Sequence, residues 1–348
     1  MSDYGILGRA LHRMMLGSTA VAETGFSIDQ ALSKARQPAD VGQGRHVFVS
    51  GLARAGTTAL MRRIHAGGAF RSLTYADMPF VLAPNLWSMI RGGRVKRIEA
   101  GERAHGDGVI VDAESPESLD EVFWRIFDGE SYIRPDRLLP HDPDTALTDR
   151  FTAYVGAILA SSGDRRYLSK NNNNVLRLPA LARTFPNAVI LVPFRAPLDH
   201  AGSLLSQHRR FGERHASDAF SADYMRWLVH HEFGGDHRPF ATHDLSEHAP
   251  DTLAYWLDQW IGVHTHLLRS APEAAQFVCY EDLCDDAALW PALAARLGID
   301  AGAGSDAPFV RAAARPPGDP LPAAQLARAE EIYATLRQRA RAPLRAAA

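Results

Sequence analysis

The sequence predicts an α/β fold in which a parallel, doubly wound sheet is flanked by helices, and three observations lead to this prediction. Short apolar runs rich in β-branched residues occur at 46–52, 188–194 and 276–283, as is typical of strands buried on both faces. Segments with helical periodicity separate these runs. Strands that alternate with helices indicate parallel strands joined by crossover connections.

The first 44 residues are expected to form a helical extension ahead of the sheet. Leucine and methionine recur at helical spacing in 3–16 and 27–36, which predicts two helices. Ser27 followed by Gln30 matches the pattern of a capping box, so the second helix is expected to begin there.

The whole chain, 1–348, is interpreted as a single domain whose nucleotide-binding core spans 45–300, followed by a loop and a helix in 301–348. Periodicity and composition predict the other elements of this domain. They are helices at 176–185, 251–271 and 323–340, a cover over the sheet edge at 209–250, and an irregular stretch at 301–321.

Composition excludes several classes of protein. The 348 residues are 46% hydrophobic and carry a net charge of -2, so the chain can bury a full core and shows no basic excess for nucleic acid. Its two cysteines, Cys279 and Cys284, exclude a disulfide framework and a four-cysteine zinc site. The cysteine usage suits a reducing compartment, and no signal peptide or membrane-spanning run is seen, so a cytoplasmic location is expected.

The segment from Gly51 to Thr58 carries the strongest functional signal. Gly51 and Gly56 allow a tight turn that presents backbone N–H groups to an anion. Thr57 and Thr58 stand where a helix begins, and the free N–H groups and dipole of a helix start both favour phosphate. The glycine spacing matches a P-loop, but the lysine of that motif is absent, and Arg54 supplies a cation from within the loop.

GLARAGTT resembles the 5'-phosphosulfate loop of sulfotransferases that use 3'-phosphoadenosine 5'-phosphosulfate (PAPS) as donor. Ala53 and Ala55 stand where that family usually has proline and serine, so one hydroxyl contact is lost. VPFRAPLDHAGSLLSQH resembles the family's 3'-phosphate site, which implies that Arg195 and Ser203 bind this phosphate. The resemblance covers about 45–300 and is closer to the bacterial carbohydrate-type and tyrosyl-protein-type branches than to the cytosolic phenol-type branch.

The resemblance implies an enzyme whose donor contacts and catalytic groups can be assigned by position. The donor contacts would be Arg54, Ala55, Gly56, Thr57, Thr58, Arg195 and Ser203. YLSKNNNN resembles the segment whose lysine faces the transferred group, so Lys170 and Arg54 are expected to stabilise charge in the transition state. Asp77 is the expected general base, and the rival candidates are Glu114, Glu117, Glu121 and His208.

Two other functions remain open from the sequence. One is a P-loop kinase acting on a small hydroxyl substrate, which the missing loop lysine disfavours. The other is a nucleotide-binding domain without catalysis, which would need Arg195 and Ser203 but not Lys170 or Asp77. The histidines between 230 and 248 have irregular spacing, so no metal site is expected. The acceptor (a glycan, a small molecule or a peptide hydroxyl) and the oligomeric state are not determined by these patterns.

Overall fold

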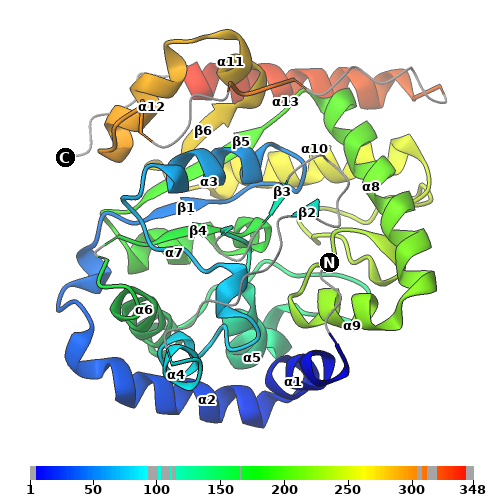
Figure 1. Ribbon diagram of the computed structural model, residues 1–348. Coiled ribbons are helices and arrows are strands. Elements are labelled where there is room, and N and C mark those ends of the chain that lie inside the picture. Colours follow the sequence, from blue (N-terminus) through cyan, green and yellow to red (C-terminus); the bar gives the residue numbers. More distant parts are fainter. Residues whose placement is uncertain are drawn as a thin grey trace.

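A computed structural model describes residues 5–92, 101–102, 110–111, 115–164, 166–303, 308–311 and 320–341. Its centre is a four-stranded sheet in the order β4-β1-β5-β6, and each neighbouring pair is parallel. The strands are β1 (Val47–Val49), β4 (Leu168–Lys170), β5 (Val189–Phe194) and β6 (Gln276–Cys279). The predicted parallel α/β architecture is therefore confirmed (Figure 1).

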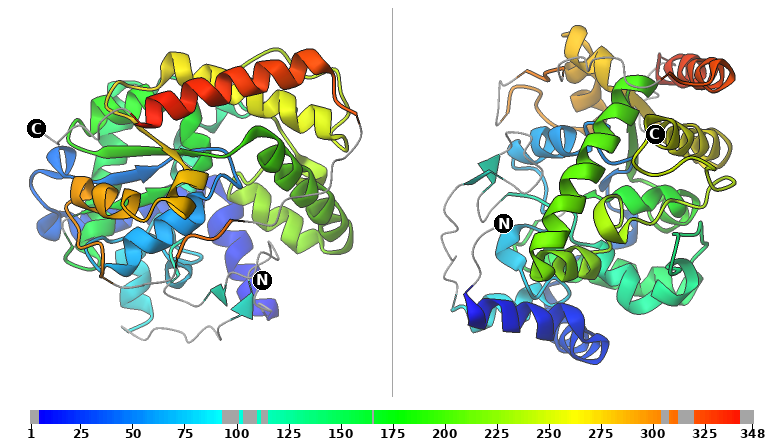
Figure 2. Two further views of the ribbon diagram at one scale, coloured as in Figure 1. Left: turned by 90° about the horizontal axis from the view of Figure 1, so that it is seen from above. Right: turned by 90° about the vertical axis from the view of Figure 1, so that its right-hand side faces the viewer.

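Every residue of the four strands is buried, because helices cover both faces of the sheet. Val47 and Val49 pack in one apolar cluster with side chains of α3, α11 and α12. Phe48 lies between them and packs in the main cluster on the other face, which includes side chains of α6, α7, α8, α10 and α13. The view from above shows the sheet between α3 and α12 on one side and α10 and α13 on the other (Figure 2).

The helices on the two faces have the following bounds. On the first face lie α3 (Thr57–Ala66), α11 (Tyr280–Asp285) and α12 (Leu289–Leu297). The second face carries α6 (Thr145–Ala160), α7 (Leu178–Thr184), α8 (Pro197–Ser217), α10 (Leu253–Ser270) and α13 (Ala323–Arg341).

The remaining elements are α1 (Ile6–Gly17), α2 (Thr19–Ser33), α4 (Pro84–Ile90), α5 (Glu121–Tyr132), α9 (Ala219–Trp227), the 3-10 turns η1 (Lys34–Arg36), η2 (Val41–Gln43), η3 (Tyr75–Asp77), η4 (Asn172–Leu176) and η5 (Gly234–Asp236), and the antiparallel pair β2 (Gly101–Glu102) and β3 (Ile110–Val111). In Figure 1, α2, α4 and α5 lie below the β4 end of the sheet, and α1 and α9 lie beside one another near α8; the other remaining elements are short.

Three boundary predictions are wrong, each for a local reason. Ser27 does not start a helix, because α2 begins at Thr19 with the Ser18 hydroxyl accepting from the Val21 N–H. The strand predicted at 276–283 ends at Cys279, and α11 follows immediately. The helix predicted at 176–185 begins at Leu178, since the turn η4 occupies Asn172–Leu176.

Candidate active site

Two predicted site residues stand at the ends of strands that reach the same edge of the sheet. Lys170 is the last residue of β4 and pairs in register with Val49 at the end of β1. Arg195 directly follows β5, the other neighbour of β1. In a parallel sheet this edge is where ligands bind. The structure thus brings the loop after β1 between the lysine and the arginine.

The loop between β1 and α3 is shaped by two glycines. Gly56 has φ +87° and caps α3 in the left-handed region, and a Cβ there would meet the Tyr280 ring at 2.2 Å. A Cβ on Gly51 would stand 2.7 Å from the carbonyl oxygen of Pro193. Gly56 has no side chain to cap the start of α3, and the dipole and N–H groups of a helix start favour an anion.

The loop is fixed to α8 by a residue that the sequence analysis missed. Nε2 of His200 donates to the backbone oxygen of Ala53 at 2.8 Å. Burial lowers the pKa of His200 far below its ordinary value, and the neighbouring His264 adds to this effect. His200 is therefore a neutral anchor for the loop. Its position five residues after Arg195, on the helix that follows β5, is the signal that could have identified it.

Arg54 and Ser203 are in direct contact. Nε of Arg54 donates to Oγ of Ser203 at 3.2 Å, and Nη1 of Arg195 donates to the backbone oxygen of Arg54 at 3.2 Å. Arg54 itself has φ +69°, an uncommon conformation for a residue with a side chain and one that occurs often at functional sites. The predicted 5'-loop and the predicted 3'-phosphate residues thus form one connected cluster.

Arg195 is 8% exposed and keeps hydrogen-bonding capacity for a ligand. Its Nε has no hydrogen-bond partner among the described residues, because the Glu281 carboxylate lies 3.9 Å away, beyond hydrogen-bond distance. An orphaned guanidinium N–H in a buried position fits an anionic ligand such as a phosphate.

Lys170 has a carboxylate for its neighbour. Its Nζ lies 3.7 Å from Oε1 of Glu117, and both side chains are at least nine-tenths buried. Glu117 also accepts from the Tyr75 hydroxyl at 3.1 Å and from the Ser118 N–H at 2.9 Å. A buried lysine and a carboxylate next to the loop between β1 and α3 can supply a cation and a proton acceptor to the same reaction.

Asp77, the predicted base, uses both carboxylate oxygens in structural contacts. Oδ1 pairs with Nη2 of Arg71 at 2.7 Å, and Oδ2 accepts from the Thr74 N–H at 2.8 Å. With Thr74 it completes a capping box around η3. These contacts favour a structural role for Asp77. Both oxygens of Glu117 also accept hydrogen bonds, and what sets Glu117 apart is its place 3.7 Å from Nζ of Lys170.

The other candidate bases lie in different surroundings. Glu121 is 1% exposed and forms a two-pronged ion pair with Arg177 at 2.7 and 2.8 Å, so access to a substrate is closed. His208 accepts from the Gly234 N–H at 3.2 Å and packs on Trp256, beneath the segment around η5. Glu114 lies outside the described residues.

A small cavity lies beside the loop, between it and the chain segments around η5 and α10. Burial lowers the pKa of His237, one of its polar lining residues, to about 4, so this side chain is neutral at pH 7. The walls are largely apolar and consist of Leu52, Ala53, Leu138, Leu204, Pro239, Phe240 and Trp256, with Asn173, Glu232, Arg238 and Gln259 as further polar members.

Within the part of the chain that the structure describes, no three His, Cys, Asp or Glu side chains are grouped so as to hold a metal ion. Nor does any described helix have the length and apolar character needed to cross a membrane.

Comparison with known proteins finds a family match and several similar structures. No curated protein gives a significant sequence match. Structural similarity is found to sulfotransferase STF1 of Mycobacterium tuberculosis (14% identity over 97% of this chain and 87% of that one, TM-score 0.48) and STF9 of Mycobacterium avium (14%, 96% and 79%, TM-score 0.43). A sulfotransferase of Alicyclobacillus acidocaldarius is also similar (16%, 86% and 95%, TM-score 0.34).

The family of this chain is shown by its sequence. The family model described as "Sulfotransferase family" matches residues 46–234, which is more than half of the chain. The matched region begins one residue before β1 and includes the phosphate loop, Lys170, Arg195 and Ser203. The chain therefore belongs to the sulfotransferase family.

Proposed function

We propose that this enzyme transfers the sulfuryl group of PAPS to an acceptor hydroxyl. The observation that carries the proposal is the cluster in which Arg54 contacts both Ser203 and Arg195 at the start of α3. A ligand with two separate anionic groups matches this arrangement, since the loop and α3 offer N–H groups to one and Arg195 with Ser203 offers donors to the other. PAPS carries such groups at its 5' and 3' positions.

In this proposal each group of the site has a distinct task. The loop N–H groups and Arg54 hold the 5'-phosphosulfate. Lys170 neutralises charge on the oxygen between sulfur and phosphorus as that bond breaks. Glu117 accepts the proton of the acceptor hydroxyl as the oxygen attacks sulfur in line, and 3'-phosphoadenosine 5'-phosphate (PAP) leaves. Arg195 and Ser203 recognise the 3'-phosphate and so discriminate against ATP. The apolar cavity beside Leu52 offers a surface for part of the acceptor.

The proposal is tested by binding and by sulfate transfer. Thermal shift should show strong stabilisation by PAP and much weaker stabilisation by ATP with magnesium, because ATP lacks the 3'-phosphate. Incubation with sulfur-labelled PAPS and separate phenol, amino-sugar and tyrosyl-peptide acceptors should label at least one class. Stronger stabilisation by ATP with magnesium would contradict the proposal and favour phosphoryl transfer.

A variant of Arg195 and a matched control test whether this residue recognises the 3'-phosphate. Arg195→Met keeps much of the side-chain volume but removes the guanidinium, and its affinity for PAP should fall by about ten- to a hundredfold, as expected for a lost charged hydrogen bond. Affinity for AMP, which has no 3'-phosphate, should change little. Arg209→Met on the exposed side of the same helix serves as the control. An equal loss for AMP and PAP would contradict the assignment of Arg195.

A further inference from the structure

Glu281 stands where the end of β6 meets the proposed 3'-phosphate site. β5 and β6 pair so that Phe194 lies opposite Cys279. Arg195 follows the first strand and Tyr280-Glu281 the second, so parallel pairing brings these residues to the same edge of the sheet. The contacts of Glu281 lead to Arg195 and so to the proposed 3'-phosphate site.

One oxygen of Glu281 faces the chain at Arg195. Oε1 accepts a hydrogen bond from the Ala196 N–H at 3.0 Å and lies 3.9 Å from Nε of Arg195. The first contact fixes the backbone on the C-terminal side of Arg195. The second holds the guanidinium by charge without using its N–H groups, because the distance is too long for a hydrogen bond. Arg195 thus stays oriented and keeps donors for an anion.

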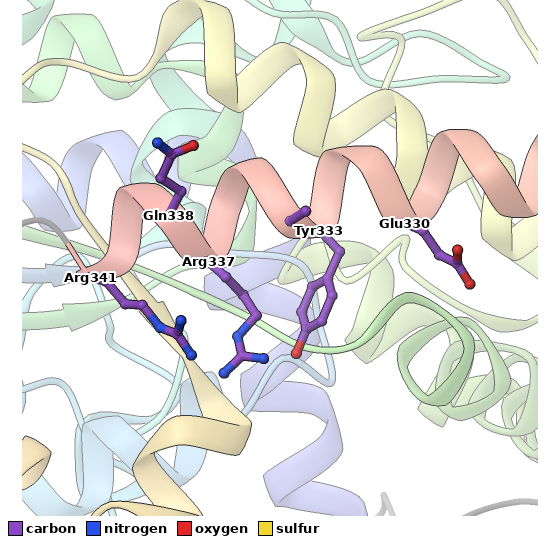
Figure 3. Close-up of a pocket in the computed structure, with 6 residues that line it drawn as sticks. Glu330, Tyr333, Arg337, Gln338 and Arg341 are labelled. Carbon is purple, nitrogen blue, oxygen red and sulfur yellow. The ribbon is translucent and has the colours of Figure 1, made fainter.

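The other oxygen of Glu281 faces the C-terminal helix. Oε2 accepts from the Tyr333 hydroxyl at 3.3 Å and from the Cys279 thiol at 3.4 Å. Glu281 is 8% exposed, so these contacts are largely shielded from water and hold the carboxylate in one place. Figure 3 shows Tyr333 and Arg337 leaving the same side of α13 as Glu330 and Arg341, while Gln338 points away from them.

We infer that Glu281 is a positioning residue for the donor site: it orients Arg195 toward the 3'-phosphate, and Tyr333 of α13 holds Glu281 in place. The inference rests on the proposed function, since it assigns a ligand to Arg195. It links the C-terminal helix, which lies outside the region matched by the family, to recognition of the nucleotide. Glu281 contributes by orienting Arg195 and not by contacting the ligand, because its own negative charge would repel a phosphate.

Asp282, the residue after Glu281, provides a matched control for variants of Glu281. Asp282 lies on the same short helix and is also tied to α13, through an ion pair of 2.6 Å with Arg337. No contact between Asp282 and Arg195 is recorded among the described residues. Asp282→Ala should therefore loosen the packing of α11 on α13 without altering the orientation of Arg195.

The readout is the ratio of affinities for PAP and AMP, measured by calorimetry on the full chain. Glu281→Ala should lower this ratio by about tenfold or more, the loss expected when one charged hydrogen bond is misdirected. Glu281→Gln should restore the ratio only in part, since an amide oxygen can accept from Ala196 and an amide N–H can donate to the Tyr333 hydroxyl, but the charge that faces Arg195 is lost. Tyr333→Phe should lower the ratio by a smaller factor, and Asp282→Ala should leave it unchanged.

Two results would overturn the inference: an unchanged ratio in Glu281→Ala, or an equal fall in Asp282→Ala. If Glu281→Ala does not fold, Glu281→Asp replaces it. That variant keeps the charge but withdraws the carboxylate by one methylene, so the ratio should still fall. A wild-type protein with no preference for PAP over AMP would instead contradict the proposed function itself.

Discussion

Nε of Arg54 donates a hydrogen bond to Oγ of Ser203, which joins the phosphate loop to the helix that follows β5 across 149 residues of sequence. The predicted 5'- and 3'-sites are consequently neighbours. Because Arg54 and Ser203 touch, the hydroxyl has two tasks in the proposed enzyme: to orient the loop arginine and to donate to the 3'-phosphate.

Ser203→Ala is expected to weaken PAP binding by about 5- to 30-fold, which corresponds to the loss of one hydrogen bond in a shielded site. The mechanism predicts a smaller loss for AMP, which retains the contact with the loop. Ser206, exposed on the same helix, gives the matched control Ser206→Ala, which should bind like the wild type. Calorimetry with both nucleotides checks this, and equal losses in the two serine variants would exclude a specific role for Ser203.

Two carboxylates compete for the role of general base, and their contacts predict different phenotypes. Glu117→Gln should lower kcat per folded molecule by about a hundredfold or more, the usual contribution of a positioned base. Lys170→Met should also lower kcat while PAP is still bound. The measurement is the initial rate with labelled PAPS and the acceptor class that gives product.

Asp77→Asn should behave in the opposite way. Loss of the ion pair with Arg71 and weakening of the capping box should lower the free energy of unfolding by about 1–3 kcal/mol. Turnover per folded molecule should be largely retained. Urea unfolding together with the same rate assay separates the two effects. A stable Asp77→Asn protein without turnover would restore Asp77 as the base.

Gly56 is required by backbone conformation and by space. Gly56→Ala places a methyl group at φ +87° and against the Tyr280 ring, so the loop must distort, at a cost of about 1–3 kcal/mol. PAP-induced stabilisation in a thermal shift should be largely lost. Gly67→Ala is the control at the other end of α3, where the added Cβ has nothing closer than 3.5 Å. Normal PAP stabilisation of Gly56→Ala would show that the loop does not need this geometry.

The raised pKa of Asp120 should make the free energy of unfolding depend on pH. Burial raises its pKa to about 6, although it accepts a hydrogen bond from Ser169 at 2.5 Å. In the unfolded chain the group titrates near its ordinary pKa of 3.8, so between about pH 4 and 6 the folded state binds more protons. The contribution of Asp120 to the free energy of unfolding is therefore fully present below about pH 4 and is lost as the pH rises through about 6.

The comparison of wild type with Asp120→Asn isolates this effect, because other titrating groups cancel. The difference in free energy of unfolding, wild type minus variant, should decrease from pH 4 to pH 7 by an amount on the order of 2–3 kcal/mol. A difference that stays constant across this range would contradict the raised pKa. Chemical unfolding at several pH values provides the measurement.

The sequence by itself determined the strand, loop and helix around Gly51–Thr58, because glycine positions, β-branched runs and helical periodicity are local signals. It also predicted the parallel sheet, and the family resemblance predicted that Lys170, Arg195 and Ser203 would belong to one site. Two element boundaries were predicted wrongly where local signals compete. Ser18, not Ser27, caps α2, and β6 ends before Tyr280.

The tertiary structure decided which partner each candidate base contacts. Asp77 is committed to Arg71, Glu121 to Arg177, and Glu117 faces Lys170. The structure also joined Arg54 to Ser203 and placed Glu281 beside Arg195. The physical reason is that these contacts link residues far apart in the chain, whose distances are set by strand register and helix packing. No local pattern encodes those distances, so the loop could be identified from the sequence while its partners could not.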